Sequence, residues 1–112
     1  MPMITVHTNK QLTKEEKALV GRGLGERITL LPGKSEASLM LEIQDGQEMF
    51  FRGGQDTCAF VEVRLFRVSP LEAKQAFTQS LCALLEEVGI PSRDVYLNFL
   101  EFDSWGIQGT LE

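Results

Sequence analysis

The chain has 112 residues, of which 43% are hydrophobic and 24% are charged, and its formal net charge at pH 7 is −5. This length fits a single domain, residues 1–112, with one core, and the apolar content excludes an intrinsically disordered chain. The acidic balance, without clustered lysine and arginine, argues against a surface for nucleic acid or for an anionic membrane. Small anionic ligands stay open, because one local cationic pocket can exist within a negatively charged protein.

The start of the chain carries no signal for export of the usual kind. The first twenty residues contain no long apolar stretch, and charged side chains such as Lys10, Lys14, Glu15 and Glu16 interrupt them. No later run approaches the length that a membrane-spanning helix needs. We therefore expect a cytoplasmic protein.

Metal binding is not expected from the sequence. The two cysteines, Cys58 and Cys82, form no Cys-x-x-Cys pair, and the single histidine, His7, has no ligand residue beside it. Structural metal sites need such ligands at short spacings. Cys82 lies in the apolar run SLCALL, which is typical of a small buried side chain.

Pro2 stands directly before the first predicted strand, residues 3–8, in which apolar and polar residues alternate. A proline is tolerated at the first position of a strand because no ladder partner needs its N–H there. If the initiator methionine is removed, however, Pro2 becomes a free secondary amine, and such an amine is a base. Position alone leaves both interpretations open.

The stretch TKEEKALVGRGLGERITLLPGK predicts a helix of about five turns. Thr13 and Glu16 have the spacing of a capping box, and the Pro-Gly pair at 32–33 marks the end. Two of its glycines, Gly21 and Gly25, share one helix face, which predicts close packing of the backbone against a sheet. The apolar stripe of this helix follows helical spacing: Val20, Leu24, Ile28 and Leu31.

Three more strands are predicted, over residues 37–45, 57–66 and 95–102. In each of them apolar side chains alternate with polar ones, as in a strand with one buried face. In the last strand, Tyr96 and Asn98 share the face that excludes Val95, Leu97 and Phe99.

A second helix is predicted in SPLEAKQAFTQSLCALLEEVG. Ser69 is expected as its N-cap, Pro70 at its first position, Glu72 in a capping box and Gly89 as its terminator. Its apolar stripe contains Phe77, Leu81, Leu84, Leu85 and Val88.

The order strand, helix, strand therefore occurs twice, which predicts an α/β (α+β) fold of two βαβ units. Each helical crossover is long enough to make its flanking strands parallel. Two amphipathic helices in so short a chain share one core, so both should cover the same face of the sheet. The other face carries Phe60 and Phe66 and is too apolar for water, so we expect neighbouring subunits to cover it.

Several stretches resemble the tautomerase superfamily and, within it, the macrophage migration inhibitory factor family. They are PMITVHTN at the start, PGKS around Lys34, FRGG, DVYLNFLEF and SWGIQGT near the end. The match extends over nearly the whole chain, in order and at the separations of the family. The sequence departs from the family pattern at Phe66-Arg67, where Ile-Gly is usual, and at Gln108, where Asn is common.

The resemblance implies a four-stranded mixed sheet with internal pseudo-twofold symmetry and two helices on one face, assembled as a homotrimer. Active sites are then expected at the subunit boundaries, with Pro2 as the catalytic base and proton donor. Lys34 and Phe66 of the same chain, and Tyr96 and Asn98 of its neighbour, are implied to bind the substrate.

Arg64 is a further candidate, since its side chain would add a second positive charge if it reached the pocket. An ion pair with a neighbouring strand is an equally good interpretation of this residue. Structural interpretations also exist for the others: Tyr96 and Asn98 can be polar side chains of a solvent-facing strand, and Phe66 can belong to the core.

The activity implied is that of a cofactor-free keto-enol tautomerase, an isomerase of the phenylpyruvate tautomerase or dopachrome isomerase type, with a small α-keto acid or enol as substrate. An α-amino group has an ordinary pKa of about 7.7 to 8.0, so the base would be mostly protonated at neutral pH. Burial in an apolar pocket and the charge of Lys34 would both lower this pKa and free the amine.

Two other functions are compatible with the sequence. The first is a cytokine-like protein that binds a cell-surface receptor after export independent of a signal peptide, with vestigial tautomerase activity. The second is a scaffolding trimer without activity.

Overall fold

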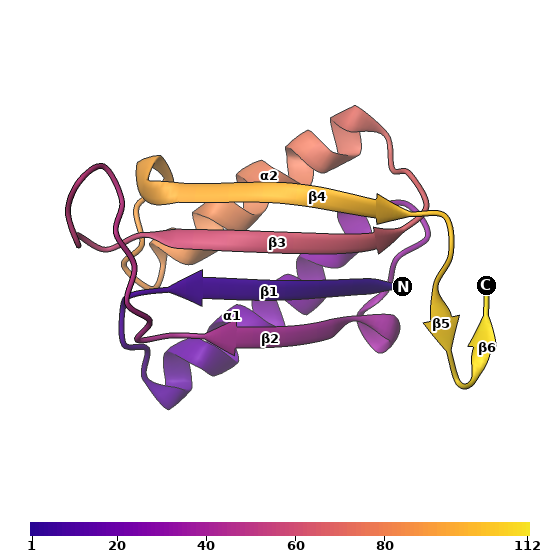
Figure 1. Cartoon of the computed structure of the whole chain (residues 1–112), viewed down its shortest axis with the longest axis horizontal. Helices are drawn as coiled ribbons and strands as arrows, with labels where there is room; N and C mark the ends of the chain where they lie inside the picture. Colours follow the sequence, from indigo (N-terminus) through magenta and orange to yellow (C-terminus); the bar gives the residue numbers. More distant parts are fainter.

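The first strand–helix–strand unit contains β1 (Pro2–Thr8), α1 (Lys14–Arg27) and β2 (Met40–Gln44) in the computed structural model, which describes residues 1–112 (Figure 1). The α-helix is shorter than the predicted five turns, because residues Ile28–Leu30 form a 3₁₀ turn instead. Leu31 precedes a proline and is extended, with φ −90° and ψ 119°. The residue before a proline avoids the helical region, so the helix has to end before it.

The second unit contains β3 (Ala59–Phe66), α2 (Leu71–Glu86) and β4 (Val95–Phe102). The predicted cap of α2 was wrong: Pro70 is the N-cap, and no side chain caps this helix. The N–H of Ser69 instead donates a hydrogen bond to Oε2 of Glu101, at 2.7 Å. A contact with β4 therefore fixes Ser69, which short-range spacing could not reveal.

The four strands form one mixed sheet, as predicted, and their order in it is β2-β1-β3-β4. The pairs β1·β2 and β3·β4 are parallel, whereas the central pair β1·β3 is antiparallel. The two βαβ units are thus related by a pseudo-twofold axis between β1 and β3. Both helices lie on the same face of the sheet (Figure 1), and the other face is open within the chain.

The core lies between the sheet and the two helices. Both predicted helical stripes are buried there, including Leu24 of α1 and Phe77 of α2, neither of which is exposed to solvent. A Cβ atom added to Gly23 would lie 2.5 Å from Cδ1 of Leu84, so the two helices pack closely at this point. Gly21 faces Leu41 of β2, as predicted, whereas Gly25 faces the side chain of Glu36 and not the sheet.

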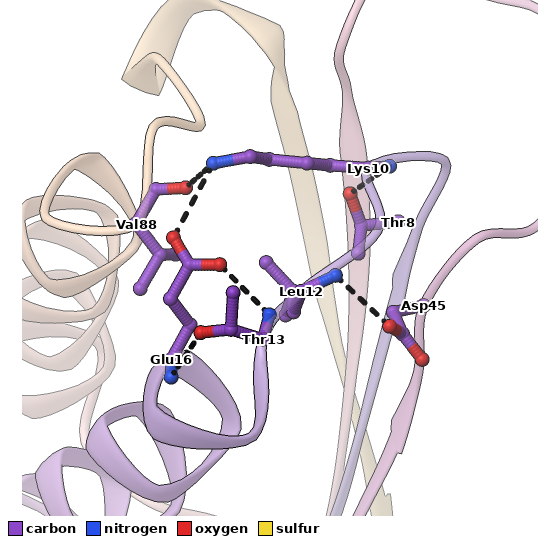
Figure 2. Close-up of polar contacts among 7 residues, drawn as sticks. All are labelled: Thr8, Lys10, Leu12, Thr13, Glu16, Asp45 and Val88. Atoms are coloured by element: carbon purple, nitrogen blue, oxygen red, sulfur yellow. Dashed lines mark hydrogen bonds and ion pairs between the residues drawn. The ribbon is translucent and has the colours of Figure 1, made fainter.

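A set of polar contacts fixes the connection between β1 and α1 (Figure 2). Nζ of Lys10 donates a hydrogen bond to the carbonyl oxygen of Val88, just beyond the end of α2, and lies 3.5 Å from Oε2 of Glu16. The predicted capping box between Thr13 and Glu16 is confirmed, with both hydrogen bonds present. On the other side, the N–H of Leu12 donates to Asp45 at 3.0 Å. The connection is therefore tied to both α2 and the end of β2.

The chain ends in a small hairpin of β5 (Gly106–Ile107) and β6 (Thr110–Leu111). This hairpin lies next to the end of the sheet at which β1 begins and is not part of that sheet (Figure 1). None of the helices has the length and apolarity to cross a membrane.

Candidate active site

Pro2 is the first residue of β1 and is buried. It pairs with Leu65 of β3, and the carbonyl oxygen of Met1 accepts a hydrogen bond from the N–H of Phe66 at 3.3 Å. Because Met1 is present, the nitrogen of Pro2 is an amide without basicity, and the free amine belongs to Met1. Backbone pairing with β3 therefore fixes the start of β1 without any contribution from the side chains of the site.

A cavity of about 870 Å³ opens beside Pro2. Of the predicted site residues, Pro2 and Arg64 line it. Most of the other lining groups are apolar side chains from three segments, including Met3, Leu39, Met40, Phe102, Trp105 and Ile107. The cavity therefore provides an apolar environment with a cation in its wall.

Lys34 lies at the edge of this region. Its Nζ donates a hydrogen bond to the carbonyl oxygen of Phe66 at 2.9 Å, which directs the ammonium group toward the start of β1. The pKa of the Met1 amino group is lowered from its usual range, first by burial and then by the charge of Lys34. The site therefore disfavours a protonated amine at the chain start, as the sequence predicted for a processed Pro2.

Arg64 and Phe66 both lie on the open face of β3, but they differ in what they contact. Arg64 is exposed, lines the cavity and forms no ion pair, so of its two interpretations the ion pair with a neighbouring strand is not found within the chain. Phe66 is half-buried and does not line the cavity. Cζ of Arg67 lies 4.8 Å from the centre of its ring instead.

Tyr96 and Asn98 lie exposed on the open face of β4, at some distance along the sheet from Pro2. Through Phe60 and Glu62 of β3, the strand register aligns them with His7 and Thr5 of β1, whereas Pro2 is aligned with Leu65. One chain therefore does not bring them to its own Pro2. Their assignment to the site of a neighbouring copy stays a prediction.

The cysteines and the histidine have other surroundings. Burial raises the pKa of both thiols, with a further contribution from Asp94 at Cys58 and from Glu86 at Cys82, which disfavours the reactive thiolate. Nε2 of His7 lies 2.6 Å from Oε2 of Glu62 across the sheet. No group of three or more His, Cys, Asp and Glu side chains is arranged to hold a metal ion.

Of the residues that line the cavity, sequence reasoning named Pro2 and Arg64 but missed most of the wall. Met3 and Met40 are cross-strand partners of the parallel β1·β2 pair, and only the register brings them together. Trp105 and Ile107 come from the C-terminal segment, whose similarity to the family ending was the one signal in the sequence that pointed to it.

Glu101 is the one charged residue of β4 and lies near the C-terminal end of that strand. Its carboxylate accepts hydrogen bonds from Nζ of Lys74 at 2.9 Å and from the N–H of Ser69 at 2.7 Å. Burial alone would raise the pKa of Glu101, but these hydrogen bonds and the charges of Lys74 and Lys34 outweigh it, and the pKa is lowered. Glu101 is therefore ionised in the folded chain at neutral pH.

Glu101 should make the stability of the fold dependent on pH. A carboxyl group with a lowered pKa in the folded state stabilises the fold above its unfolded pKa of about 4.3, and this contribution is lost as the pH falls through the lowered value. We expect Glu101→Gln to reduce the free energy of unfolding at pH 7 and to lose most of this effect near pH 3, as measured by urea denaturation. Glu87→Gln, which removes an exposed carboxylate without an ion pair, is the control. An equal difference at both pH values would contradict the role assigned to Glu101.

Comparisons with known proteins agree with this fold. The sequence model of the family described as "Macrophage migration inhibitory factor (MIF)" matches residues 1–111. The macrophage migration inhibitory factor homolog of Brugia malayi is 25% identical over 105 residues, which cover 93% of this chain and 90% of that protein. The crystal structure of Leishmania major MIF2 has a TM-score of 0.92 and 22% identity, and covers 100% of this chain and 97% of that chain.

Two further solved structures share the fold. One is described as "Q0 fused 4-OT wild type symmetric trimer", with a TM-score of 0.84, 20% identity, and coverage of 95% of this chain and 91% of that chain. The other is Pt0534 inactivated by 2-oxo-3-pentynoate, with a TM-score of 0.81, 21% identity, and coverage of 96% and 93%. These structures show the fold, and the match of the family model over residues 1–111 shows the family. The chain belongs to the macrophage migration inhibitory factor family, within the tautomerase superfamily.

Proposed function

We propose that this protein is a cofactor-free keto-enol tautomerase for α-keto acids of the phenylpyruvate type, with dopachrome-like compounds as further substrates. Membership of the tautomerase superfamily supports isomerase chemistry in general, and the substrate is our proposal. The observation that carries it is the buried start of β1, where an amine has a lowered pKa beside Lys34 and next to an apolar cavity. Removal of Met1 would place the secondary amine of Pro2 there.

The proposed reaction needs one base. The unprotonated Pro2 nitrogen takes a proton from the carbon next to the keto group, the C–H electron pair forms the C=C bond, and the C=O π pair moves onto the oxygen, to which the protonated Pro2 then delivers the proton. In the reverse direction, the protonated Pro2 returns the proton to carbon. A base with a pKa near the working pH suits such transfers in both directions. General acid–base catalysis by such a group typically raises the rate by about 100 to 10,000-fold.

The cavity has groups for both ends of an aryl α-keto acid. Arg64 in the cavity wall would supply positive charge for the carboxylate, with Lys34 at the edge of the region as a second cation, while apolar side chains such as Trp105 and Phe102 can contact the ring. Tyr96 of a neighbouring copy would donate a hydrogen bond to the developing enolate, with Asn98 beside it.

This last contribution requires a homotrimer. Its support is the open sheet face, on which large apolar side chains are exposed: Met40, Tyr96, Leu100 and Phe102. A surface of this kind is typical of an interface. One structure of the same fold is described as a symmetric trimer. Receptor binding and cytoplasmic location stay predictions.

The experiment that tests the proposal uses 2-oxo-3-pentynoate, the compound that inactivates the structurally similar Pt0534. An unprotonated amine adds to the alkyne of such a ketone, forming a C–N bond while a proton moves to the neighbouring carbon. We expect the processed protein to gain the mass of one reagent molecule per chain at Pro2, with a parallel loss of phenylpyruvate ketonisation. Tandem mass spectrometry of the N-terminal peptide locates the adduct.

The matched control is a chain with one alanine added ahead of Pro2. Its proline nitrogen is an amide, so Pro2 should stay unmodified, and phenylpyruvate should not be ketonised. Ketonisation by the alanine-extended chain, or full activity of protein whose Pro2 carries the adduct, would show that Pro2 is not the base.

A further inference from the structure

A tight turn at one end of the sheet has an unusual residue at its centre. The N–H of Phe51 donates to the carbonyl oxygen of Gly54 at 2.8 Å, and the N–H of Gly54 donates to that of Phe51 at 3.1 Å. The two central residues, Arg52 and Gly53, have φ angles of 54° and 78°. Positive φ at both positions is the pattern of a type I′ turn, which favours Asn, Asp or Gly. Arginine is poorly suited to this backbone conformation. The contacts of its side chain offer a reason for its presence there.

The guanidinium of Arg52 attaches this turn to the segment that leads into β4. One terminal nitrogen donates to Oδ1 of Asp94 at 2.8 Å, and the other donates to the carbonyl oxygen of Arg93 at 2.6 Å. Its Cζ atom also lies 4.5 Å from the centre of the Phe51 ring. Asn or Gly could form the turn but could make none of these contacts.

Phe51 in turn contacts Tyr96. The two rings meet edge to face, with centroids 4.9 Å apart and planes at 80°. The Tyr96 residue is 64% exposed, and its hydroxyl has no hydrogen-bond partner within the chain. The contact with Phe51 is therefore the aromatic packing that orients this exposed side chain.

We propose that Arg52 is a positioning residue for the tautomerase site. It holds Phe51 against the start of β4, and Phe51 fixes the Tyr96 ring, so that the hydroxyl is ready for a substrate bound at Pro2 of the neighbouring copy. The inference rests on the proposed function, since Tyr96 would act only in an assembled trimer. It assigns a role in the reaction to a turn that does not line the cavity.

The first test observes Tyr96 directly, because it is the only tyrosine of the chain. Protein made with 3-fluorotyrosine gives a single ¹⁹F resonance. We expect Arg52→Asn, which suits the turn but removes the guanidinium, to shift and narrow this resonance as the ring loses its fixed contact. Arg93→Ala is the matched control, because the Arg93 side chain is 76% exposed and its Nε lies 3.9 Å from Asp94. An unchanged resonance in the Arg52 variant would overturn the inference.

The second test separates positioning from a merely structural effect. We expect Arg52→Asn to lower kcat/KM for phenylpyruvate on the order of 5-fold, and to have almost no effect in a Tyr96→Phe background, since coupled residues are not additive. Arg52→Lys, which keeps the charge but not the planar fork, should be intermediate. Equal losses in both backgrounds, or a loss explained by dissociation in size-exclusion chromatography, would refute the role.

The outcomes also distinguish this inference from the proposed function. A wild-type protein that does not ketonise phenylpyruvate would overturn both. A wild-type enzyme that depends on Pro2 but tolerates Arg52→Asn would overturn the inference alone.

Discussion

Pro2→Gly is expected to lower kcat/KM for phenylpyruvate ketonisation by about 100-fold or more, which is what a general base typically contributes. After removal of Met1, the variant still has a free amine at its N-terminus, but glycine lacks the ring that fixes the nitrogen at the start of β1. It is also a primary amine, and its backbone has far more conformations to lose on ordering. The rate of ketonisation, followed by ultraviolet absorbance with purified and mass-verified protein, measures the effect.

A pH profile gives an independent check of the same prediction. Burial and Lys34 lower the pKa of the Met1 amine, and we expect both to act in the same way on the Pro2 amine once Met1 is removed. The rising limb of kcat/KM should then lie below the ordinary range of about 7.7 to 8.0. Lys34→Ala removes one of these causes, so the limb should move to higher pH. Full activity in Pro2→Gly, with an unchanged profile, would falsify the assignment of Pro2 as the base.

Phe77→Ala is expected to lower the free energy of unfolding by about 3–5 kcal/mol, the range measured for such truncations in protein cores. The Phe77 residue is 0% exposed and packs against Phe99 with ring centroids 6.3 Å apart, so the variant leaves a cavity where α2 covers the sheet. For a fold whose total stability is about 5–15 kcal/mol, this loss is a large fraction. Urea denaturation at one fixed protein concentration measures it, because assembly makes stability depend on concentration.

The matched control is Phe50→Ala. This residue is 70% exposed, so the same chemical change should alter the unfolding free energy by no more than about 0.5 kcal/mol. A comparable loss in both variants would mean that Phe50 is covered in the assembled protein and that burial within one chain does not account for the difference.

The sequence predicted the fold where local pattern and tertiary structure agree. The strand at 95–102 was predicted with its observed bounds, since its alternation has one partly buried and one exposed face. Phe77 and the rest of the helical stripes were likewise placed in the core from spacing alone. Strand alternation and helical spacing depend only on residues a few positions apart, so they can be read from the sequence alone.

The wrong cap at Ser69 and the assignments that the sequence left open depend on contacts between residues far apart in the sequence or on a second copy. Ser69 looked like a helix cap, but its N–H is bound by Glu101, 32 positions later in the chain. Arg64 could not be assigned to a strand pair or to a pocket until the C-terminal segment was placed beside β1. The roles of Tyr96 and Asn98 depend on a second copy, which no single chain displays.

The pairing of two similar halves about the β1·β3 axis has a consequence for counting reactive groups. The second half begins at Ala59, where the polypeptide continues from Cys58 through an ordinary peptide bond. Only the first half of the chain therefore has a terminal amine, even though the second half has the same fold. Active-centre titration of pure material should accordingly saturate at one equivalent of reagent for each polypeptide.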